Sequence, residues 1–135
     1  MKLSRYISTV MHPEWFHGDL FTPPYFEGWY FKVVSADRSN AYAFIPGVYL
    51  DADTVKSHAF LQVMDGNTGL VHEQQFPISE FSWSKDPFAV RICRSQFSLS
   101  GIQVDMDAAD FHLTGRIDFG EMNPWEVKWY SPGIM

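Results

Sequence analysis

The chain has 135 residues and a mass of 15.6 kDa, which suits one domain with its own hydrophobic core and excludes two domains of ordinary size. Apolar residues make up 46% of it and charged residues 19%, a balance that excludes an intrinsically disordered chain. Sixteen acidic residues outnumber ten basic ones, the net charge is −6, and no basic cluster interrupts the acidic average. A nucleic-acid partner is therefore excluded.

Cysteine content and hydropathy narrow the class of protein further. Cys93 stands alone, so the chain has no intramolecular disulfide and no multi-cysteine metal site, and a half-buried structural thiol is the better interpretation. No apolar run approaches the roughly 20 residues of a membrane helix, and the N-terminus lacks a sustained apolar stretch. We expect a cytoplasmic protein without an integral membrane segment, without a cofactor and without a metal.

The chain divides into two parts of different character. Residues 1–25 are rich in His, Pro and aromatic side chains without periodicity, which predicts an irregular N-terminal arm laid over an edge or mouth of the fold. Residues 26–135 form the second part, in which alternation of period two recurs from Gly28 to Phe119 and no helical periodicity is present. This part is expected to be an antiparallel β domain.

The first predicted strand is Gly28–Ser35. Its alternation places Trp29, Phe31 and Val33 on one face and Tyr30, Lys32 and Val34 on the other. Asp37–Asn40 has the composition of a turn, and Ala41–Leu50 follows as the second strand. Because proline cannot donate a hydrogen bond to the ladder, Pro46-Gly47 predicts a kink or bulge in that strand.

A hairpin is predicted next. Ser57–Met64 leads into Asp65–Gly69, whose Asp, Asn and two Gly suit a tight loop, and Leu70–Phe76 returns antiparallel. Four further strands are expected at Phe81–Ser84, Phe88–Arg91, Ile102–Met106 and Asp110–Phe119. In the last of them Phe111, Leu113, Ile117 and Phe119 alternate with His112, Thr114, Arg116 and Asp118, which predicts one apolar and one solvated face.

About eight short strands at this spacing favour an all-β meander, and we predict an antiparallel lipocalin-like barrel or half-barrel. The segment Trp125–Met135 ends on apolar residues without a polar tail. We therefore expect the natural chain to continue, so that this domain is one half of a two-lobed protein. Exposed apolar surface would then mark an interface, and we expect a homodimer in isolation or packing against the second half.

Standard catalytic signatures are absent: the sequence contains no GxSxG, GxGxxG, Walker or HExxH motif. His12, Glu14, His17 and Asp19 bring metal-ligand types together within eight residues, but their spacing matches no standard site. A solvated arm is the favoured interpretation of that cluster.

His58 and Gln62 lie four residues apart on a predicted strand, so they share a face with Phe60 and Met64. On a face lining a barrel, His58 could titrate or position a substrate hydroxyl and Gln62 could hold a second polar atom. A structural role, with both groups satisfied by backbone or water, is equally well supported.

Glu27 is the second candidate for chemistry, because it stands amid the aromatic residues of Tyr25–Lys32 (YFEGWYFK). Burial among apolar rings raises the pKa of a carboxyl group, and a Glu that stays protonated is a competent general acid. The faces of Trp29, Tyr30 or Tyr25 could stabilise a developing cation. A structural hydrogen bond at the strand start, or an ion pair with Lys32, is the favoured alternative.

Four motifs and a preceding dipeptide occur in an order that resembles the tocopherol cyclase family. They are His17-Gly18, YFEGWYFK at Tyr25–Lys32, AFIPG at Ala43–Gly47, HAFLQV at His58–Val63 and SPGIM at Ser131–Met135. The resemblance covers His17 to Met135, and in that family SPGIM is followed by a further half with its own motifs. It implies a lipocalin-like architecture of two related halves, of which this chain matches the N-terminal one.

The resemblance also implies a reaction, in which a prenyl double bond is protonated and the tertiary cation is captured by a hydroquinone oxygen. Such chemistry requires an apolar cavity, a proton donor, aromatic faces near the cation and exclusion of water. The residues carried over are Glu27 or His58 as the acid, with Trp29, Tyr30, Tyr42, Phe44, Phe60 and Gln62 as substrate-binding positions. The alternative function is a non-catalytic carrier or sensor that holds an apolar small molecule in the same cavity.

Overall fold

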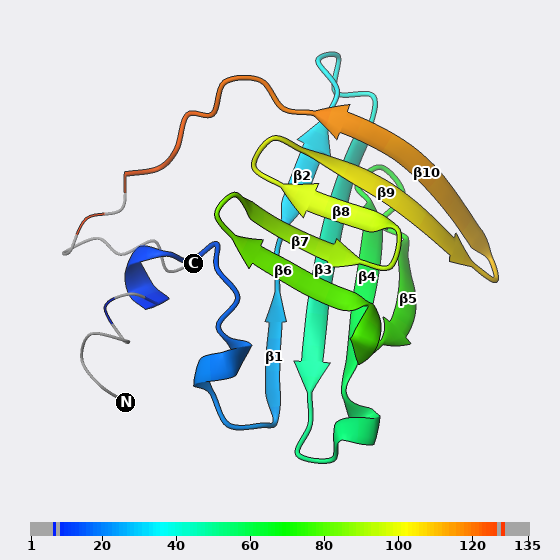
Figure 1. Ribbon diagram of the computed structural model, residues 1–135. Coiled ribbons are helices and arrows are strands. Elements are labelled where there is room, and N and C mark those ends of the chain that lie inside the picture. Colours follow the sequence, from blue (N-terminus) through cyan, green and yellow to red (C-terminus); the bar gives the residue numbers. More distant parts are fainter. Residues whose placement is uncertain (1–6, 8, 127, 129–135) are drawn as a thin grey trace.

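The computed structural model describes residues 7, 9–126 and 128 and shows two antiparallel five-stranded sheets (Figure 1). Sheet A contains β1 (Tyr25–Gly28), β2 (Phe31–Val34), β3 (Ala41–Leu50), β4 (His58–Asp65) and β5 (Val71–Pro77). Sheet B contains β6 (Phe81–Lys85), β7 (Phe88–Ile92), β8 (Ser95–Ser98), β9 (Gly101–Ala108) and β10 (Phe111–Asp118). Three short 3-10 helices are η1 (Gly18–Leu20), η2 (Thr54–Lys56) and η3 (Ile78–Glu80).

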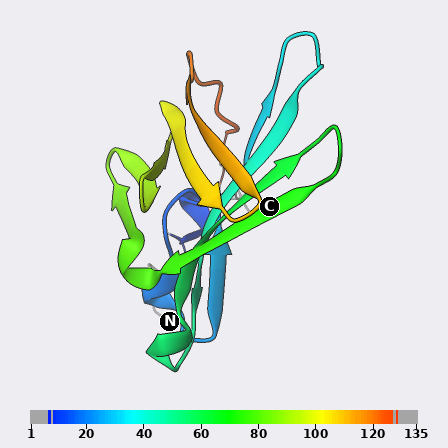
Figure 2. The ribbon, with the colours of Figure 1, turned by 90° about the vertical axis from the view of Figure 1, so that its right-hand side faces the viewer.

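The predicted all-β antiparallel class is confirmed, but a closed barrel is not. The order in sheet A is β1-β3-β4-β5 with β2 also paired to β3, and the order in sheet B is β10-β9-β8-β7-β6. Within the described residues neither sheet closes on itself. The strands of sheet B run across those of sheet A in Figure 1, and the side view in Figure 2 shows the β2–β3 and β4–β5 turns projecting beyond sheet B.

The β3 strand has the predicted bounds, but the kink expected at Pro46-Gly47 is wrong. Pairing with β4 continues without a break from Tyr42↔Asp65 to Tyr49↔His58. The Pro46 carbonyl accepts a hydrogen bond from the Trp29 N–H at 2.9 Å, so the proline nitrogen also faces β1 and β2. The missing donor interrupts that neighbouring ladder instead, and the predicted strand Gly28–Ser35 is therefore divided between β1 and β2 at Trp29-Tyr30.

The alternation predicted along the divided strand is confirmed. Trp29, Phe31 and Val33 contribute to the hydrophobic core, whereas Tyr30 and Val34 are exposed. The β10 alternation is also confirmed, with Phe111, Leu113, Ile117 and Phe119 against the core. Every strand of sheet A has an inner face toward sheet B and an outer face away from it, and these two faces determine where the candidate site residues lie.

The predicted β4–β5 hairpin is confirmed, with pairing from His58↔Pro77 to Met64↔Val71. Its loop is held by Asp65, whose side chain accepts hydrogen bonds from the main-chain N–H groups of Asn67 at 2.8 Å and Thr68 at 3.3 Å. Gly69 adopts a φ of 75°, in the left-handed region that favours glycine. The local sequence therefore contains the turn chemistry that the structure uses.

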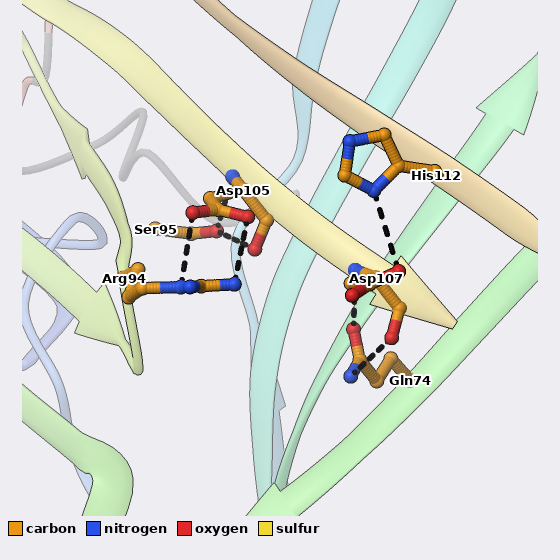
Figure 3. Close-up of polar contacts among 6 residues, drawn as sticks. All are labelled: Gln74, Arg94, Ser95, Asp105, Asp107 and His112. Atoms are coloured by element: carbon orange, nitrogen blue, oxygen red, sulfur yellow. Dashed lines mark hydrogen bonds and ion pairs between the residues drawn. The ribbon is translucent and has the colours of Figure 1, made fainter. Parts of the chain in front are cut away.

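The strand β8 was not predicted from the sequence. It follows β7 through a two-residue turn at Cys93-Arg94, in which Cys93 has a φ of 53° and Ile92 pairs with Ser95. Such turns usually carry Gly, Asn or Asp, so Cys-Arg gave no turn signal. Tertiary contacts hold the turn instead: Arg94 Nε lies 2.9 Å from Asp105 Oδ2, and the Ser95 hydroxyl accepts a hydrogen bond from the Asp105 N–H at 2.9 Å (Figure 3).

The core lies between the inner faces of the two sheets. Side chains from both sheets are fully buried there, namely Val48, Ala59 and Leu61 from sheet A and Val90, Ile92, Phe97 and Met106 from sheet B. Aromatic rings extend this core on both sides, including Phe31 against Phe97 at a centroid distance of 5.4 Å. Burial of this apolar surface supplies the main driving force for packing one sheet on the other.

One side chain also joins the sheets at their edge. The Gln74 amide on β5 donates to the Asp107 carbonyl of β9 at 3.0 Å and accepts from the Asp107 N–H at 3.1 Å. Figure 3 shows both bonds, with His112 on the other side of Asp107. The amide thus pairs with one residue of β9 as a neighbouring strand would.

The expected arm, residues 1–25, contains a helical turn at residues 9–11 and η1, and reaches β1 at Tyr25. Figure 1 shows η1 beside β1. The motif at Ser131–Met135 and the apolar end of Trp125–Met135 beyond Lys128 lie outside the described residues. In the part of the chain that is described, no helix is long and apolar enough to cross a membrane.

Candidate functional site

The candidate site lies where the N-terminal arm meets the inner face of β1. Phe16 anchors the arm, because its ring is buried against Trp29, Phe81 and Trp83, with ring centroids 5.3 to 6.4 Å apart. A Cβ atom on Gly18 would lie 2.2 Å from the Phe16 ring and 2.9 Å from Leu50, so a larger residue there would displace the Phe16 ring. This close approach brings the intervening residue, His17, onto β1.

His17 and Glu27 form a buried imidazole–carboxylate pair. The His17 Nδ1 lies 2.8 Å from Glu27 Oε1, and the His17 main-chain N–H donates to Glu27 Oε2 at 2.8 Å. The side chains are only 10% and 12% exposed. Because a carboxylate oxygen accepts hydrogen bonds, Nδ1 carries a proton and the carboxylate fixes the ring in one orientation.

The other ring nitrogen of His17 is the chemically interesting atom. Nε2 is buried and has no hydrogen-bond partner among the described residues. Buried polar atoms are almost always paired, since an unpaired one forfeits its bonds to water. An oriented imidazole with a free Nε2 is the arrangement that general acid–base catalysis uses.

Tyr25 adds a third polar group beside the pair. Burial, followed by the charge of Glu27 and a hydrogen bond with that side chain, raises the pKa of the Tyr25 hydroxyl above its usual range. Its ring stacks on exposed Phe21 at 5.0 Å and 8°. Tyr25 thus stays protonated at neutral pH and links the buried pair to an aromatic surface.

Trp29 closes the site on the core side. Its indole Nε1 donates to the Glu14 carbonyl at 2.8 Å, which attaches the arm a second time. Its ring packs against Phe81 at 6.2 Å and Phe88 at 6.3 Å. Of the aromatic residues next to Glu27 in the sequence, Tyr25 and Trp29 share its face of the sheet, whereas Phe26 and Tyr30 lie on the opposite face. The structural hydrogen bond weighed as the alternative is present, with His17 as the partner instead of Lys32.

The structure separates the residues that the sequence analysis grouped. The inner face of sheet A carries Glu27, Trp29, Tyr42 and Phe44, and the outer face carries Tyr30, His58, Phe60 and Gln62. Glu27 shares its face with Val48 and Ala59, whereas Phe26 shares the opposite face with Tyr49 and His58. The expectation that Glu27 and His58 face the same interior is wrong. Glu27 pairs with Val48, whereas His58 pairs with Tyr49, the next residue of β3, so the two side chains lie on opposite faces of the sheet.

His58 and Gln62 share one face of β4, as predicted, but that face points away from sheet B. A hollow of about 280 Å³ opens there, lined by Phe26, Tyr49, His58, Phe60, Gln62 and Glu73. A second, polar hollow of about 170 Å³ lies on the outer face of sheet B, around Gln103 and Arg116. Both hollows are on outer surfaces, whereas the expected cavity was in the interior.

The arm residues considered as metal ligands separate in the structure. His12 Nδ1 lies 3.1 Å from Glu14 Oε1 and its ring stacks on Trp15 at 3.7 Å, while His17 turns to Glu27. Among the described residues no group of three or more His, Cys, Asp and Glu side chains gathers at one point.

His17 is the functional residue that sequence reasoning placed wrongly. It was assigned to the arm cluster, and its partner lies ten residues away across η1 and two prolines. The only sequence signal was its place in the His17-Gly18 dipeptide, where the glycine allows the close approach. The expected homodimer stays a prediction; exposed apolar side chains that it could cover include Phe26 and Tyr30.

No protein-family model, no curated protein and no solved structure matches this chain. A functional assignment therefore rests on its sequence and structure.

Proposed function

We propose that this protein catalyses proton transfer to an apolar, ring-bearing metabolite, in the manner of the tocopherol cyclase family that its motifs resemble. The reaction is an acid-catalysed cyclisation or isomerisation of a prenylated quinol or a related compound. One observation carries the proposal: the buried His17–Glu27 pair leaves His17 Nε2 unpartnered in an aromatic setting. The two sheets with the arm would then form a lipocalin-like half-barrel around the substrate.

The pair performs the chemistry through Nε2. Glu27 accepts a hydrogen bond from Nδ1–H and stabilises the positive charge of a doubly protonated imidazole. Nε2 donates its proton to one carbon of the prenyl double bond and leaves a tertiary cation on the other. The quinol oxygen attacks that cation and releases its own proton to Nε2. One C–H and one C–O bond form, one C=C π bond and one O–H bond break, and His17 returns to its starting state.

The surrounding rings stabilise the cation. Phe16 of the arm lies against Trp29 at a centroid distance of 6.4 Å, and both rings are buried. Aromatic faces attract a cation most strongly where water is excluded. The same exclusion protects the cation from capture by water, so that ring closure competes successfully.

Access to Nε2 requires movement of the groups that cover it. Since the side chains of His17 and Glu27 are only 10% and 12% exposed, a substrate reaches Nε2 only when neighbouring side chains move while His17 stays paired with Glu27 on β1. The second candidate function is a carrier that holds an apolar ligand without proton transfer. Proton transfer requires exposure of Nε2 to the substrate, and carrying a ligand does not. The burial of the pair favours this alternative, because a carrier has no need to expose Nε2.

Turnover of a prenylated hydroquinone tests the proposal. Glu27→Gln and His17→Gln are expected to lower kcat by roughly 10²- to 10⁴-fold, the usual contribution of general acid–base catalysis. His112→Gln is the matched control, because His112 forms an exposed pair with Asp107 at 3.3 Å. A ligand recovered unchanged from every protein would favour the carrier, and full turnover in both site variants would remove the pair from the mechanism.

A further inference from the structure

The hollow on the outer face of sheet A has the features of a second binding site. It spans four neighbouring strands, with Phe26 from β1, Tyr49 from β3, His58, Phe60 and Gln62 from β4, and Glu73 from β5. Its volume of about 280 Å³ suits one or two fused rings, since drug-sized ligands occupy pockets from about 300 Å³ upward. It lies on the opposite face from the His17–Glu27 pair, so the proposed proton transfer does not use it.

Aromatic rings form the apolar part of the hollow. Phe26 stacks on Phe60 at 5.5 Å and 4°, yet Phe26 remains 63% exposed. Tyr49 packs beside the His58 ring at 5.4 Å. A large ring held at the surface in a fixed orientation offers a flat apolar contact to a ligand.

The polar part of the hollow offers hydrogen-bond acceptors. His58 Nδ1 lies 2.9 Å from the Lys56 carbonyl, which only accepts, so in the neutral ring the free nitrogen Nε2 is an acceptor. Gln62 Nε2 donates to Glu73 Oε2, which leaves the Gln62 amide oxygen. The Tyr49 hydroxyl donates to Asp51 at 2.9 Å. The Tyr49 hydroxyl, the His58 Nδ1–H and one N–H of Gln62 are thus engaged with protein groups, and acceptors remain for a ligand.

A negative charge accompanies these acceptors. Hydrogen bonds from Gln62 and then from Gln75 lower the pKa of the Glu73 carboxyl group, which is therefore ionised at neutral pH. Among the described residues that line the hollow, His58 is the only basic one. A ligand that is flat, apolar, rich in hydrogen-bond donors and positively charged satisfies all four features.

We propose that this hollow binds a protonated aromatic amine. The ring lies against the stacked pair of Phe26 and Phe60, which lies between Tyr49 and Gln62 on this face and places the cationic end near aromatic faces. The ammonium group donates hydrogen bonds to Glu73 and to the free oxygen of Gln62. This inference is independent of the proposed function, because the side chains of the hollow lie on the face of sheet A opposite to Glu27.

Two probes that differ in one group test the inference. Tryptamine carries an ammonium group at neutral pH, and tryptophol carries a neutral hydroxyl on the same indole ring. Titration of each into isotopically labelled protein, followed by NMR, is expected to shift the amide signals of Phe26, Gln62 and Glu73 with tryptamine. Tryptophol is expected to bind at least about tenfold more weakly, the factor that corresponds to 1.4 kcal/mol.

Variants then assign the selectivity to its source. Glu73→Gln is expected to remove the preference for tryptamine, whereas Glu80→Gln, an exposed carboxylate outside the hollow, keeps it. Phe26→Ala is expected to weaken both probes, and preserved amide spectra show that each variant is folded. Equal affinity for the two probes in the wild type would overturn the inference, as would the absence of shifts at the hollow up to about 10 mM tryptamine, beyond the weakest useful affinities.

Discussion

The ring of Phe60 lies across Gly47 on the outer face of sheet A. The two residues are directly paired between β4 and β3, and a Cβ atom on Gly47 would stand 2.2 Å from the Phe60 ring and 2.8 Å from the Glu27 carbonyl. Phe60 is thereby buried on a face that otherwise points to solvent. An aromatic ring over a strand glycine restores the packing that the glycine itself lacks.

This contact makes Gly47 intolerant of any side chain. Gly47→Ala is expected to lower the free energy of unfolding by roughly 1–3 kcal/mol, because Phe60 or the β1 backbone must move. Gly115→Ala is the control, since nothing lies within 4 Å of its Cβ position. Equal stability of the two variants in urea unfolding would show that the ring moves aside at no cost.

Glu27 is expected to be essential for stability as well as for chemistry. Glu27→Gln leaves two donors, the His17 N–H and Nδ1–H, with a single acceptor oxygen, and should cost roughly 2–3 kcal/mol in urea unfolding. The comparison is Glu14→Gln, whose partner His12 is 43% exposed. If both variants lose the same small amount, the buried pair contributes nothing special.

The Gln74 side chain should stabilise the contact between the two sheets at their edge. Gln74→Ala removes both bonds to Asp107 and is expected to cost about 1–3 kcal/mol. Hydrogen exchange of the Asp107 amide should accelerate by about tenfold or more, because local opening becomes easier. Gln75→Ala serves as the control, since that exposed amide donates to Glu73 and makes no contact with Asp107 that the described residues show. Unchanged exchange at Asp107 would contradict the assignment.

Stability should depend on pH through Asp37. A hydrogen bond from the Ser35 hydroxyl, followed by those from Ser39, lowers the pKa of Asp37 from 3.8 to about 2. A pKa lowered by folding stabilises the protein above the unfolded value, and that contribution is lost as the pH falls from about 4 towards 2. The stability difference between wild type and Asp37→Asn should therefore be constant above about pH 5 and shrink below pH 4. A stability difference that grows as the pH falls would contradict a stabilising role for the Asp37 carboxylate.

The sequence predicted those features that depend on local chemistry. Ala41–Leu50 and the Asp65–Gly69 hairpin were correct because alternation and turn residues specify them within a few positions. The predictions were wrong or missing where contacts between residues distant in the sequence determine the structure. β8 depends on Arg94 meeting Asp105 eleven residues away. The faces of Glu27 and His58 depend on the registers of β1 and β4 against β3, which no local pattern specifies.

For the candidate site, too, local features were predicted from the sequence and long-range contacts were not. The proximity of Tyr25 and Trp29 to Glu27 followed from their places in the chain, but the partner His17 comes from an arm without periodicity. The pairing requires Gly18 to fit beneath Phe16, a steric relationship that exists only once the arm has folded onto β1. The outer hollow likewise exists only when four strands bring their side chains together.

The most direct measurement of the central claim is the fate of a single proton. If His17 Nε2 protonates a substrate double bond, reaction of a prenylated hydroquinone in D₂O gives a cyclised product with one deuterium on carbon, detected by mass spectrometry. We expect this labelled product with the wild-type protein and its loss in His17→Gln. Recovery of unlabelled, unchanged hydroquinone from the wild-type protein would contradict it.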